Sequence, residues 1–526
     1  MRRWSTAIAS AVAALVVVTF GVGRPARAAS AAEGCAGPSV TPAQVVACLH
    51  DGVVDLHDVE ITGTLDLRPI GTVSTPVRCQ RCRIDGDLVV TGVTFAHAVE
   101  LDDVVVSGSV RGTDARFADV VLVRSTRADG AAVHGDLVLD RADFADLASF
   151  DGLTIQGQAS LPGARFARAA SFRGAQFDGA LDLEQVNVAG SLLLSGDRPS
   201  TIGGASATAS GPVSMRAAQF GGIVDLRDRV FHGDVDGQGA TFGASALFST
   251  AFLADLDLAG STFADLDAHS ASVEGALTLR NVTATSINLG HANVGALDMA
   301  SASIAKQAQL KGLDVTDAVN VEDLRAGSLS MDIDLLAHAR SRTALLASYT
   351  QVESTARSAG DSRLANEAHY RRLALAGRQG SWLHTATDFV FYRGVFGYLV
   401  RPLHPATTLL ILVVLATLAR LWFDRSEAAH APTRPGPRVD RTPRRSVRVG
   451  RVVSGVFSRF SRSLGAALRP KPSIPSPAGQ NHFTPYLVAA GRWSEFLAGK
   501  VLLFLFVVCL GNANATLHDL FQALKG

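Results

Sequence analysis

The chain is poor in cysteine, in charge and, over most of its length, in large polar aromatic residues. Only 5 of its 526 residues are cysteine, too few for a disulfide-built scaffold. Charged residues make up 18% and sum to a net charge of +1, which gives no overall signal for nucleic acid binding. Between residues 30 and 348 there is no Trp or Tyr. Sugar-processing sites usually stack such rings on their substrate, so this gap argues against a carbohydrate enzyme.

Apolar residues and glycine are plentiful instead. Hydrophobic residues account for 47% of the chain, and there are 49 glycines and 25 phenylalanines. The mean hydropathy of +0.22 argues against a disordered chain and against a purely soluble one. We therefore expect some part of the chain to contact lipid.

The N-terminus has the features of an export signal. Arg2 and Arg3 precede an apolar run over residues 7–22, and Ala26-Arg27-Ala28 is a small-x-small cleavage pattern. This pattern predicts a signal peptide over residues 1–28. An uncleaved anchor helix is the alternative, and it leaves the following domain on the same side of the membrane.

Two apolar segments near the C-terminus predict membrane helices over residues 405–423 and 493–514. The loop between them, residues 424–492, is strongly basic and is expected to stay cytoplasmic. The preceding domain is then extracytoplasmic, in agreement with the signal peptide. An aromatic-rich stretch over 380–404 predicts an interfacial helix, and residues 515–526 form a short tail. The basic residues expected to set topology and contact anionic lipid are Arg441, Arg444, Arg445, Arg448 and Arg451.

A repeat of 10 to 11 residues extends over about residues 53–331. Each unit alternates in steps of two and is rich in Val, Phe and Thr, which favours short strands over helices. Within the units, a small residue stands two positions before a large one every five or six residues. The pairs are Ala142/Phe144, Ala148/Phe150, Ala164/Phe166, Ala170/Phe172, Ala175/Phe177, Ala218/Phe220, Ala240/Phe242 and Ala246/Phe248.

This pattern resembles the pentapeptide-repeat family. The resemblance implies a mainly β fold, a right-handed quadrilateral β-helix in which the large residue and the preceding small one both face inward. The small residue is needed because two large side chains on each face would overfill so narrow a core. The frequent sixth residue departs from the family pattern and predicts bulges at the corners.

Both ends of the repeat carry candidate caps. Residues 29–52 contain a predicted short helix with Thr41 as N-cap, Pro42 in the first turn and Gly52 beyond its end. Residues 332–379 change to a helical period that is broken at Gly360 and Asp361, which predicts a helical hairpin. A Gly- and Ser-rich stretch over 195–208 interrupts the repeat and predicts an excursion from one corner.

The C-terminal third resembles bacterial pentapeptide-repeat proteins that end in a helical hairpin and a two-helix, pore-like membrane domain. The hairpin likeness rests on Ala365-Asn366-Glu367-Ala368-His369-Tyr370. Phe483-Thr484-Pro485-Tyr486-Leu487 stands where a channel filter would lie, and the filter sequence is missing. Without a ring of filter carbonyls, selective potassium conduction is not supported.

The cysteines are the main candidates for site chemistry. Cys35 and Cys48 flank the predicted N-terminal helix, and in an exported domain they predict a structural disulfide. Cys79 and Cys82 form a C-x-x-C pair, for which a local disulfide, two inert thiols or a redox-active site are the alternatives. Cys79 falls on an inward position of its unit.

Other candidate motifs have simpler explanations within the repeat. The pairs Asp255/Asp257 and Asp265/Asp267 place carboxylates on one strand face, where they could act as acid and base. In this register they are better explained as part of a solvated outer face. The glycine-rich run Gly237 to Gly243 lies within the repeat period and is not followed by a helix pattern, so it does not predict a dinucleotide loop.

The leading hypothesis is a non-catalytic scaffold or sensing protein of the bacterial cell envelope, anchored in the cell membrane, with its repeat domain outside and its basic loop in the cytoplasm. The expected partners are the lipid bilayer and another envelope protein or a second copy of the chain, and not nucleic acid. No cofactor, metal or catalytic residue is predicted, and the sequence favours a protein that is not an enzyme. The alternatives are an oligomeric, channel-like or transport-coupled protein, and a membrane-associated oxidoreductase that uses Cys79 and Cys82.

Overall fold

A computed structural model describes residues 37–52, 54–127, 130–197, 206–339 and 341–376, together with residues 411 and 414. The predicted signal peptide, interfacial helix, basic loop and C-terminal tail lie outside this part of the chain, as do both predicted membrane helices apart from residues 411 and 414. None of the helices within the described residues is both long enough and apolar enough to cross a membrane. The described residues divide into two compact units, one ending at Ala276 and the next beginning at Leu277.

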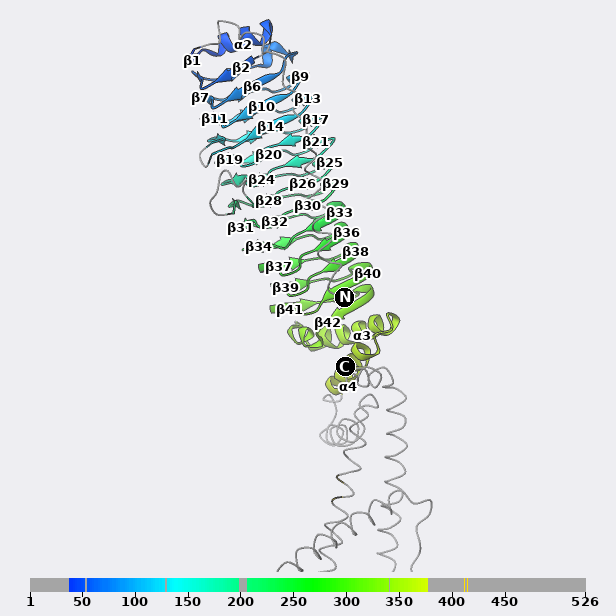
Figure 1. Cartoon of the computed structure of the whole chain (residues 1–526). Helices are drawn as coiled ribbons and strands as arrows, with labels where there is room; N and C mark the ends of the chain where they lie inside the picture. The colour runs from blue at the N-terminus through cyan, green and yellow to red at the C-terminus, as the bar shows by residue number, and fades with distance from the viewer. Residues whose placement is uncertain are drawn as a thin grey trace, which may run out of the picture. The chain divides into compact units, whose positions relative to one another are not determined.

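The first unit is a β-solenoid made of short parallel strands (Figure 1). Successive coils pair in register, so that Phe144 lies beside Phe166 and Arg165 beside Asn187. Contacts between neighbouring coils typically join residues 22 positions apart. The coil length therefore equals two of the repeat units seen in the sequence.

The strands of the first unit belong to two sheets. The first sheet contains β1 (Ser39–Val40), β3 (Glu60–Ile61), β4 (Leu65–Asp66), β7 (Arg83–Ile84), β8 (Leu88–Val89), β11 (Val105–Val106), β12 (Val110–Arg111), β15 (Ala132–Val133), β16 (Leu137–Val138), β19 (Thr154–Ile155), β20 (Ala159–Ser160), β23 (Gln176–Phe177), β24 (Leu181–Asp182), β27 (Thr208–Ala209), β28 (Val213–Ser214), β31 (Val230–Phe231), β32 (Val235–Asp236), β34 (Ala251–Phe252), β35 (Leu256–Asp257) and β37 (Ser272–Thr278), whose last residues enter the second unit. The second sheet contains β2 (Val54–His57), β5 (Thr72–Val73), β6 (Val77–Gln80), β9 (Thr94–Phe95), β10 (Val99–Asp102), β13 (Arg116–Phe117), β14 (Val121–Arg124), β17 (Asp143–Phe144), β18 (Ala148–Ser149), β21 (Arg165–Phe166), β22 (Ala170–Ser171), β25 (Asn187–Val188), β26 (Leu192–Leu193), β29 (Gln219–Phe220), β30 (Val224–Asp225), β33 (Thr241–Leu247) and β36 (Thr262–Asp267).

The core of this unit consists of the small and large residues that the repeat places two apart. Ala164 and Phe166 are both fully buried, whereas Arg165 between them is exposed. Rings in neighbouring coils stack, as Phe144 does on Phe166 with centroids 4.6 Å apart. The alternation expected from the sequence is therefore the one that fills the solenoid.

The N-terminal helix α2 (Pro42–Asp51) packs against β2. The Thr41 hydroxyl accepts a hydrogen bond from the Gln44 backbone N–H, and the Gln44 side chain accepts one from the Thr41 N–H, which completes a capping box. A short 3₁₀ segment, η2 (Arg68–Ile70), lies between β4 and β5.

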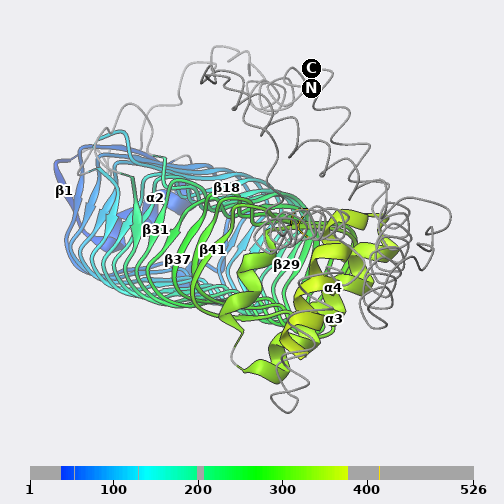
Figure 2. The same ribbon diagram turned by 90° about the horizontal axis from the view of Figure 1, so that it is seen from below.

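The second unit contains further parallel strands followed by helices. Its elements are β38 (Thr283–Asn288), β39 (Asn293–Asp298), β40 (Ser303–Leu310), β41 (Asp314–Asn320), β42 (Arg325–Met331), η3 (Ile333–His338), α3 (Arg342–Ser358) and α4 (Ser362–Ala376). Helix α3 packs on α4 (Figure 2), and it also packs on β42. The Gln351 side chain donates to the Leu324 carbonyl at 2.6 Å, which satisfies a backbone group at the end of the strands.

Candidate functional site

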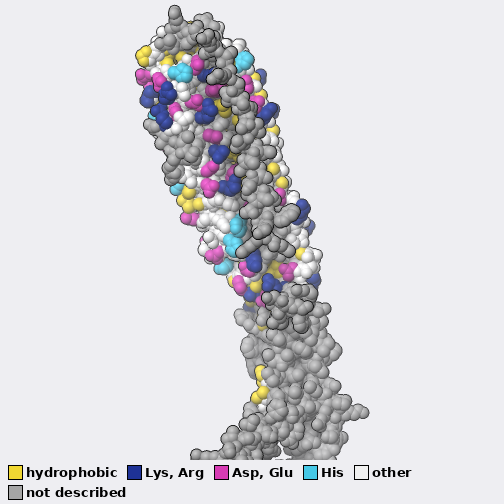
Figure 3. Space-filling view, viewed as in Figure 1, with side chains coloured by type: hydrophobic (Ala, Val, Ile, Leu, Met, Phe, Trp, Pro, Cys, Tyr) yellow, Lys and Arg dark blue, Asp and Glu magenta, His cyan; other side chains and the backbone are white. Residues whose placement is uncertain are grey.

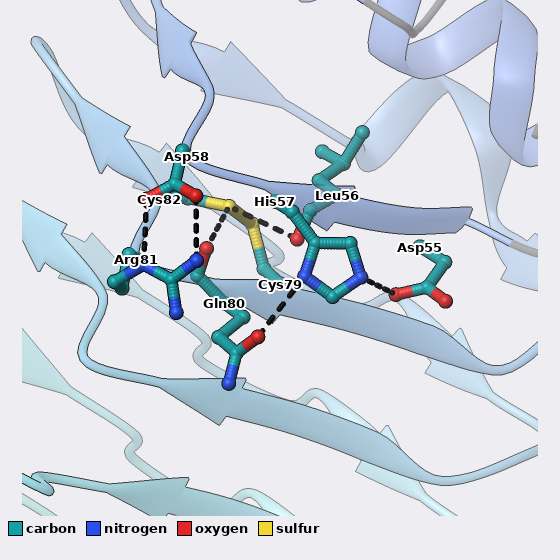
Figure 4. The surroundings of a disulfide bond; sticks show 8 residues. All are labelled: Asp55, Leu56, His57, Asp58, Cys79, Gln80, Arg81 and Cys82. Atoms are coloured by element: carbon teal, nitrogen blue, oxygen red, sulfur yellow. Dashed lines mark hydrogen bonds and ion pairs between the residues drawn. A yellow bond between two sulfur atoms is a disulfide. The ribbon is translucent and has the colours of Figure 1, made fainter.

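The cysteine pair singled out by the sequence forms a disulfide in the structure. Cys79 on β6 and Cys82 are joined, with their Cα atoms 5.9 Å apart (Figure 4). Between them, Arg81 turns the corner of the coil with a left-handed φ of 55°. The disulfide therefore links the two ends of a tight turn.

Both sulfur-bearing residues point into the solenoid. Cys79 pairs with Leu56 on β2 and with Leu101 on β10, in a row of inward-facing side chains. Cys79 is 7% exposed and Cys82 is 1% exposed. Thiol–disulfide exchange requires a nucleophile to reach a sulfur atom, so this burial favours a structural bond over a redox centre.

The polar residues around the disulfide lie on the outer side of the same strands (Figure 4). His57 contacts the Asp55 carboxylate at 3.0 Å and the Gln80 side-chain oxygen at 3.1 Å. Arg81 donates two hydrogen bonds to Asp58, at 2.6 and 2.5 Å, and these bonds lower the pKa of Asp58. Because side chains alternate across a strand, His57 and Gln80 project from the face opposite Leu56 and Cys79. The strand thus separates the imidazole from the disulfide.

The paired carboxylates have turn-stabilising contacts. Asp257 accepts hydrogen bonds from the Ala259 N–H at 2.9 Å and from the Gln238 side chain at 2.7 Å. Asp255 accepts one from the Ala276 N–H at 2.8 Å, and Asp267 accepts one from the His269 N–H at 3.1 Å. The contacts of Asp257 and Asp267 are local Asx turns, whereas that of Asp255 joins two coils. Asp255 and Asp265 are exposed, and Asp257 and Asp267 are half-buried, as expected for an outer face of the repeat.

Charged residues on the outer face pair from coil to coil. Arg124 lies 2.8 Å from Asp102, and Arg141 lies 2.9 Å from Asp114. In the space-filling view, basic and acidic side chains alternate over the visible face of the solenoid (Figure 3). No group of three or more His, Cys, Asp or Glu side chains among the described residues is arranged to hold a metal ion. The described surface is thus a mixed-charge face with many local ion pairs.

A buried arginine is the residue that the sequence reasoning missed. Arg229 is 1% exposed, and its guanidinium donates to the backbone carbonyls of Leu194 at 2.5 Å and Ala175 at 2.6 Å. It also donates to the carbonyls of Phe172, Ser195 and Thr208. These carbonyls lie where the repeat is interrupted, since Gln176 and Thr208 are neighbours 32 positions apart instead of 22. Arg229 therefore supplies hydrogen-bond donors to carbonyls around this interruption, two of which, Phe172 and Ser195, also accept the backbone N–H groups of Ala175 and Gly174.

A second polar cluster lies between α3 and α4. Glu353 on α3 is 8% exposed at its side chain and contacts Arg357 at 2.8 Å, His369 at 3.0 Å and Arg372 at 3.0 Å. Burial alone would raise the pKa of Glu353, but the His369 hydrogen bond and the three positive partners outweigh it and lower the pKa. The cluster includes His369 of the hairpin motif, and its geometry joins the two helices.

The remaining predicted site residues cannot all be placed. Cys48 is disulfide-bonded, while Cys35, its predicted partner, lies outside the described residues. The arginines of the basic loop, Arg441, Arg444, Arg445, Arg448 and Arg451, also lie outside them. Their expected roles in topology and lipid contact stay predictions.

One comparison with known proteins supports the fold of the repeat domain. A family model for pentapeptide repeats, covering nine copies of the repeat, matches residues 139–187. No curated protein and no solved structure gives a significant match. The matched segment runs through β17, β21 and β25, where small and large inward residues alternate most regularly. The match and the β-solenoid together support a pentapeptide-repeat protein.

Proposed function

We propose that the chain is a non-catalytic interaction scaffold of the bacterial cell envelope. In this proposal a right-handed, four-sided repeat domain lies outside the cell, and two C-terminal helices anchor it in the membrane. Its partners are the lipid bilayer and either another envelope protein or a second copy of the chain. The four-sided form is supported by the strand order, because a coil contributes β17, β18, β19 and β20 before β21 pairs with β17.

The observation that carries the scaffold role is the ordered outer face of the solenoid. Side chains at equivalent positions of successive coils are held together, as Arg124 is with Asp102 and Gln176 with Thr208. Stacked repeats give a regular surface whose shape does not depend on a ligand, and such surfaces suit the binding of extended partners. The buried disulfide supports the same interpretation, because its sulfurs are placed to stabilise a coil and not to react.

The membrane anchor and the external location are supported by the sequence alone. The export signal over residues 1–28 and the basic loop over 424–492 independently predict the same orientation. The loop arginines would face the cytoplasmic leaflet, where anionic lipids attract them.

Site-specific photo-crosslinking in intact cells tests the scaffold role. A photoreactive amino acid replaces the exposed Asn187 or Gln219 on the outer face, and the matched control places it at the buried Val188 or Phe220 of the same strands. A scaffold gives the same discrete protein adducts from both outer positions and none from the buried ones. Loss of every adduct at the outer positions, with the protein present at normal levels, would contradict the role.

A further inference from the structure

The interior of the first unit contains an apolar cavity. It has a volume of about 100 Å³ and lies among the coils that include β8, β10, β12 and β14. Every residue that lines it is Leu, Val or Phe. The adjoining backbone is already paired, since the N–H groups of Val90 and Gly112 donate to carbonyls of the next coil at 2.7 Å. The cavity therefore offers no hydrogen-bonding partner for water.

Side-chain size explains why the cavity occurs in these coils. Leu101 on β10 and Val123 on β14 occupy the same inward row as Phe150 and Phe172 in the following coils. Phe150 and Phe172 stack with centroids 4.9 Å apart and fill the centre of their coils. The smaller Leu101 and Val123 leave this central space empty.

At a glycine in the opposite wall, the neighbouring side chains pack directly over the backbone. Gly112 follows β12, in the row that holds Val90 and Leu139 in the neighbouring coils. A Cβ atom at Gly112 would meet Leu139 Cδ2 at 2.8 Å and Val90 Cγ2 at 3.2 Å, so the missing side chain is one that would crowd the cavity wall. A side chain at Gly112 would therefore displace the end of Leu139, which lines the cavity.

The exposure of the lining residues agrees with an internal space. Val99 and Val121 are buried, yet Leu101 and Val123, which point inward from the same two strands, keep accessible surface. Both side chains are among the residues that line the cavity.

We propose that this cavity is a binding site for one small apolar molecule that carries no hydrogen-bonding group and is no larger than benzene. Apolar cavities on the order of 150 Å³ in other proteins stay dry and bind benzene or xenon. The cavity described here is somewhat smaller and has the same lining chemistry. Binding would gain dispersion contacts that the empty wall lacks.

Xenon is the probe, applied under pressure to crystals of the full chain. Its anomalous scattering should give one peak between Leu101, Val123 and Leu139. The variant Val123→Phe should abolish the peak, because the new ring would extend the stack begun by Phe150. The variant Gly112→Ala should weaken or abolish the xenon peak by pushing the end of Leu139 into the cavity. This second variant still tests the site if Val123→Phe does not fold.

The matched control removes bulk from a filled coil. Phe172→Val should create a second xenon peak at the level of β22 and leave the first in place. A native crystal with no peak, a peak unchanged in both filling variants, or ordered water in the cavity would overturn the proposal.

Discussion

The Nε atom of Arg229 lies 2.5 Å from the carbonyl oxygen of Leu194, and its guanidinium stands 5.3 Å from the centre of the Phe177 ring. A charged group at this depth is costly unless its hydrogen bonds are made. Here the guanidinium donates to the carbonyls of Ser195 and Thr208, which lie on either side of the interruption in the repeat. Arg229 is thus the link that lets the solenoid continue across an interrupted coil.

Replacement of Arg229 should therefore destabilise the solenoid locally. Arg229→Met removes the guanidinium donors from the buried carbonyls of Leu194 and Ala175, and we expect a loss of about 3 kcal/mol. Hydrogen–deuterium exchange should rise in residues 192–197 and 206–209. The control Arg168→Met removes an exposed partner of Asp146 and should change stability by less than about 1 kcal/mol. Equal effects of the two variants would contradict the structural role of Arg229.

The narrow core predicts intolerance of larger residues at the small inward positions. Ala170 is fully buried in the row that precedes Phe172, so Ala170→Leu should cost about 1–3 kcal/mol through overpacking. Chemical denaturation of the full chain measures this loss. Ala167 faces outward in the same coil, and Ala167→Leu should leave the midpoint nearly unchanged. An unchanged stability of Ala170→Leu would show that the core is not filled as described.

A structural disulfide predicts a loss of stability without a loss of function. The double variant Cys79→Ser, Cys82→Ser should be destabilised by about 2 kcal/mol, the value expected for a short closed loop. Cells that carry it at normal protein levels should keep the biological role of the native chain. Loss of that role, with the fold intact by circular dichroism, would favour the oxidoreductase hypothesis.

The stability of the helical hairpin should depend on acid pH. The pKa of Glu353 is lowered in the folded state, so its contribution is complete above its ordinary value of 4.5 and is lost as the pH falls through the folded value. Chemical denaturation of the full chain at a series of pH values measures this change. Glu353→Gln should flatten the acid dependence, whereas the exposed Glu322→Gln should not. An unchanged acid profile in Glu353→Gln would exclude this carboxylate as the cause.

Much of the fold was predictable because each repeat unit carries its own packing rule. Ala164 and Phe166 share a face by their spacing alone, and the helix start at Thr41 follows from local capping chemistry. The inward position of Cys79 followed from its place in the unit. The disulfide itself was one of three alternatives, since spacing does not show the state of the sulfurs.

The partners of Arg229 and the lining of the cavity come from several coils, so the spacing within one repeat unit does not identify them. Arg229 stands two before Phe231, where a small residue is expected, and that departure was the available signal. Its partners lie between 21 and 57 positions earlier in the chain. The cavity likewise depends on Leu101 and Val123 lying in the row that Phe150 and Phe172 continue, which requires the register of the coils.

The placement of the repeat domain outside the cell is the central claim, and paired cysteine labelling tests it most directly. Ser303→Cys puts a thiol on the exposed face of β40, and Ser446→Cys puts one in the basic loop, both in a Cys509→Ser background. A membrane-impermeant maleimide added to intact cells should label Ser303→Cys at once and Ser446→Cys only after permeabilisation. Labelling of Ser446→Cys in intact cells, with Ser303→Cys protected until lysis, would contradict the account.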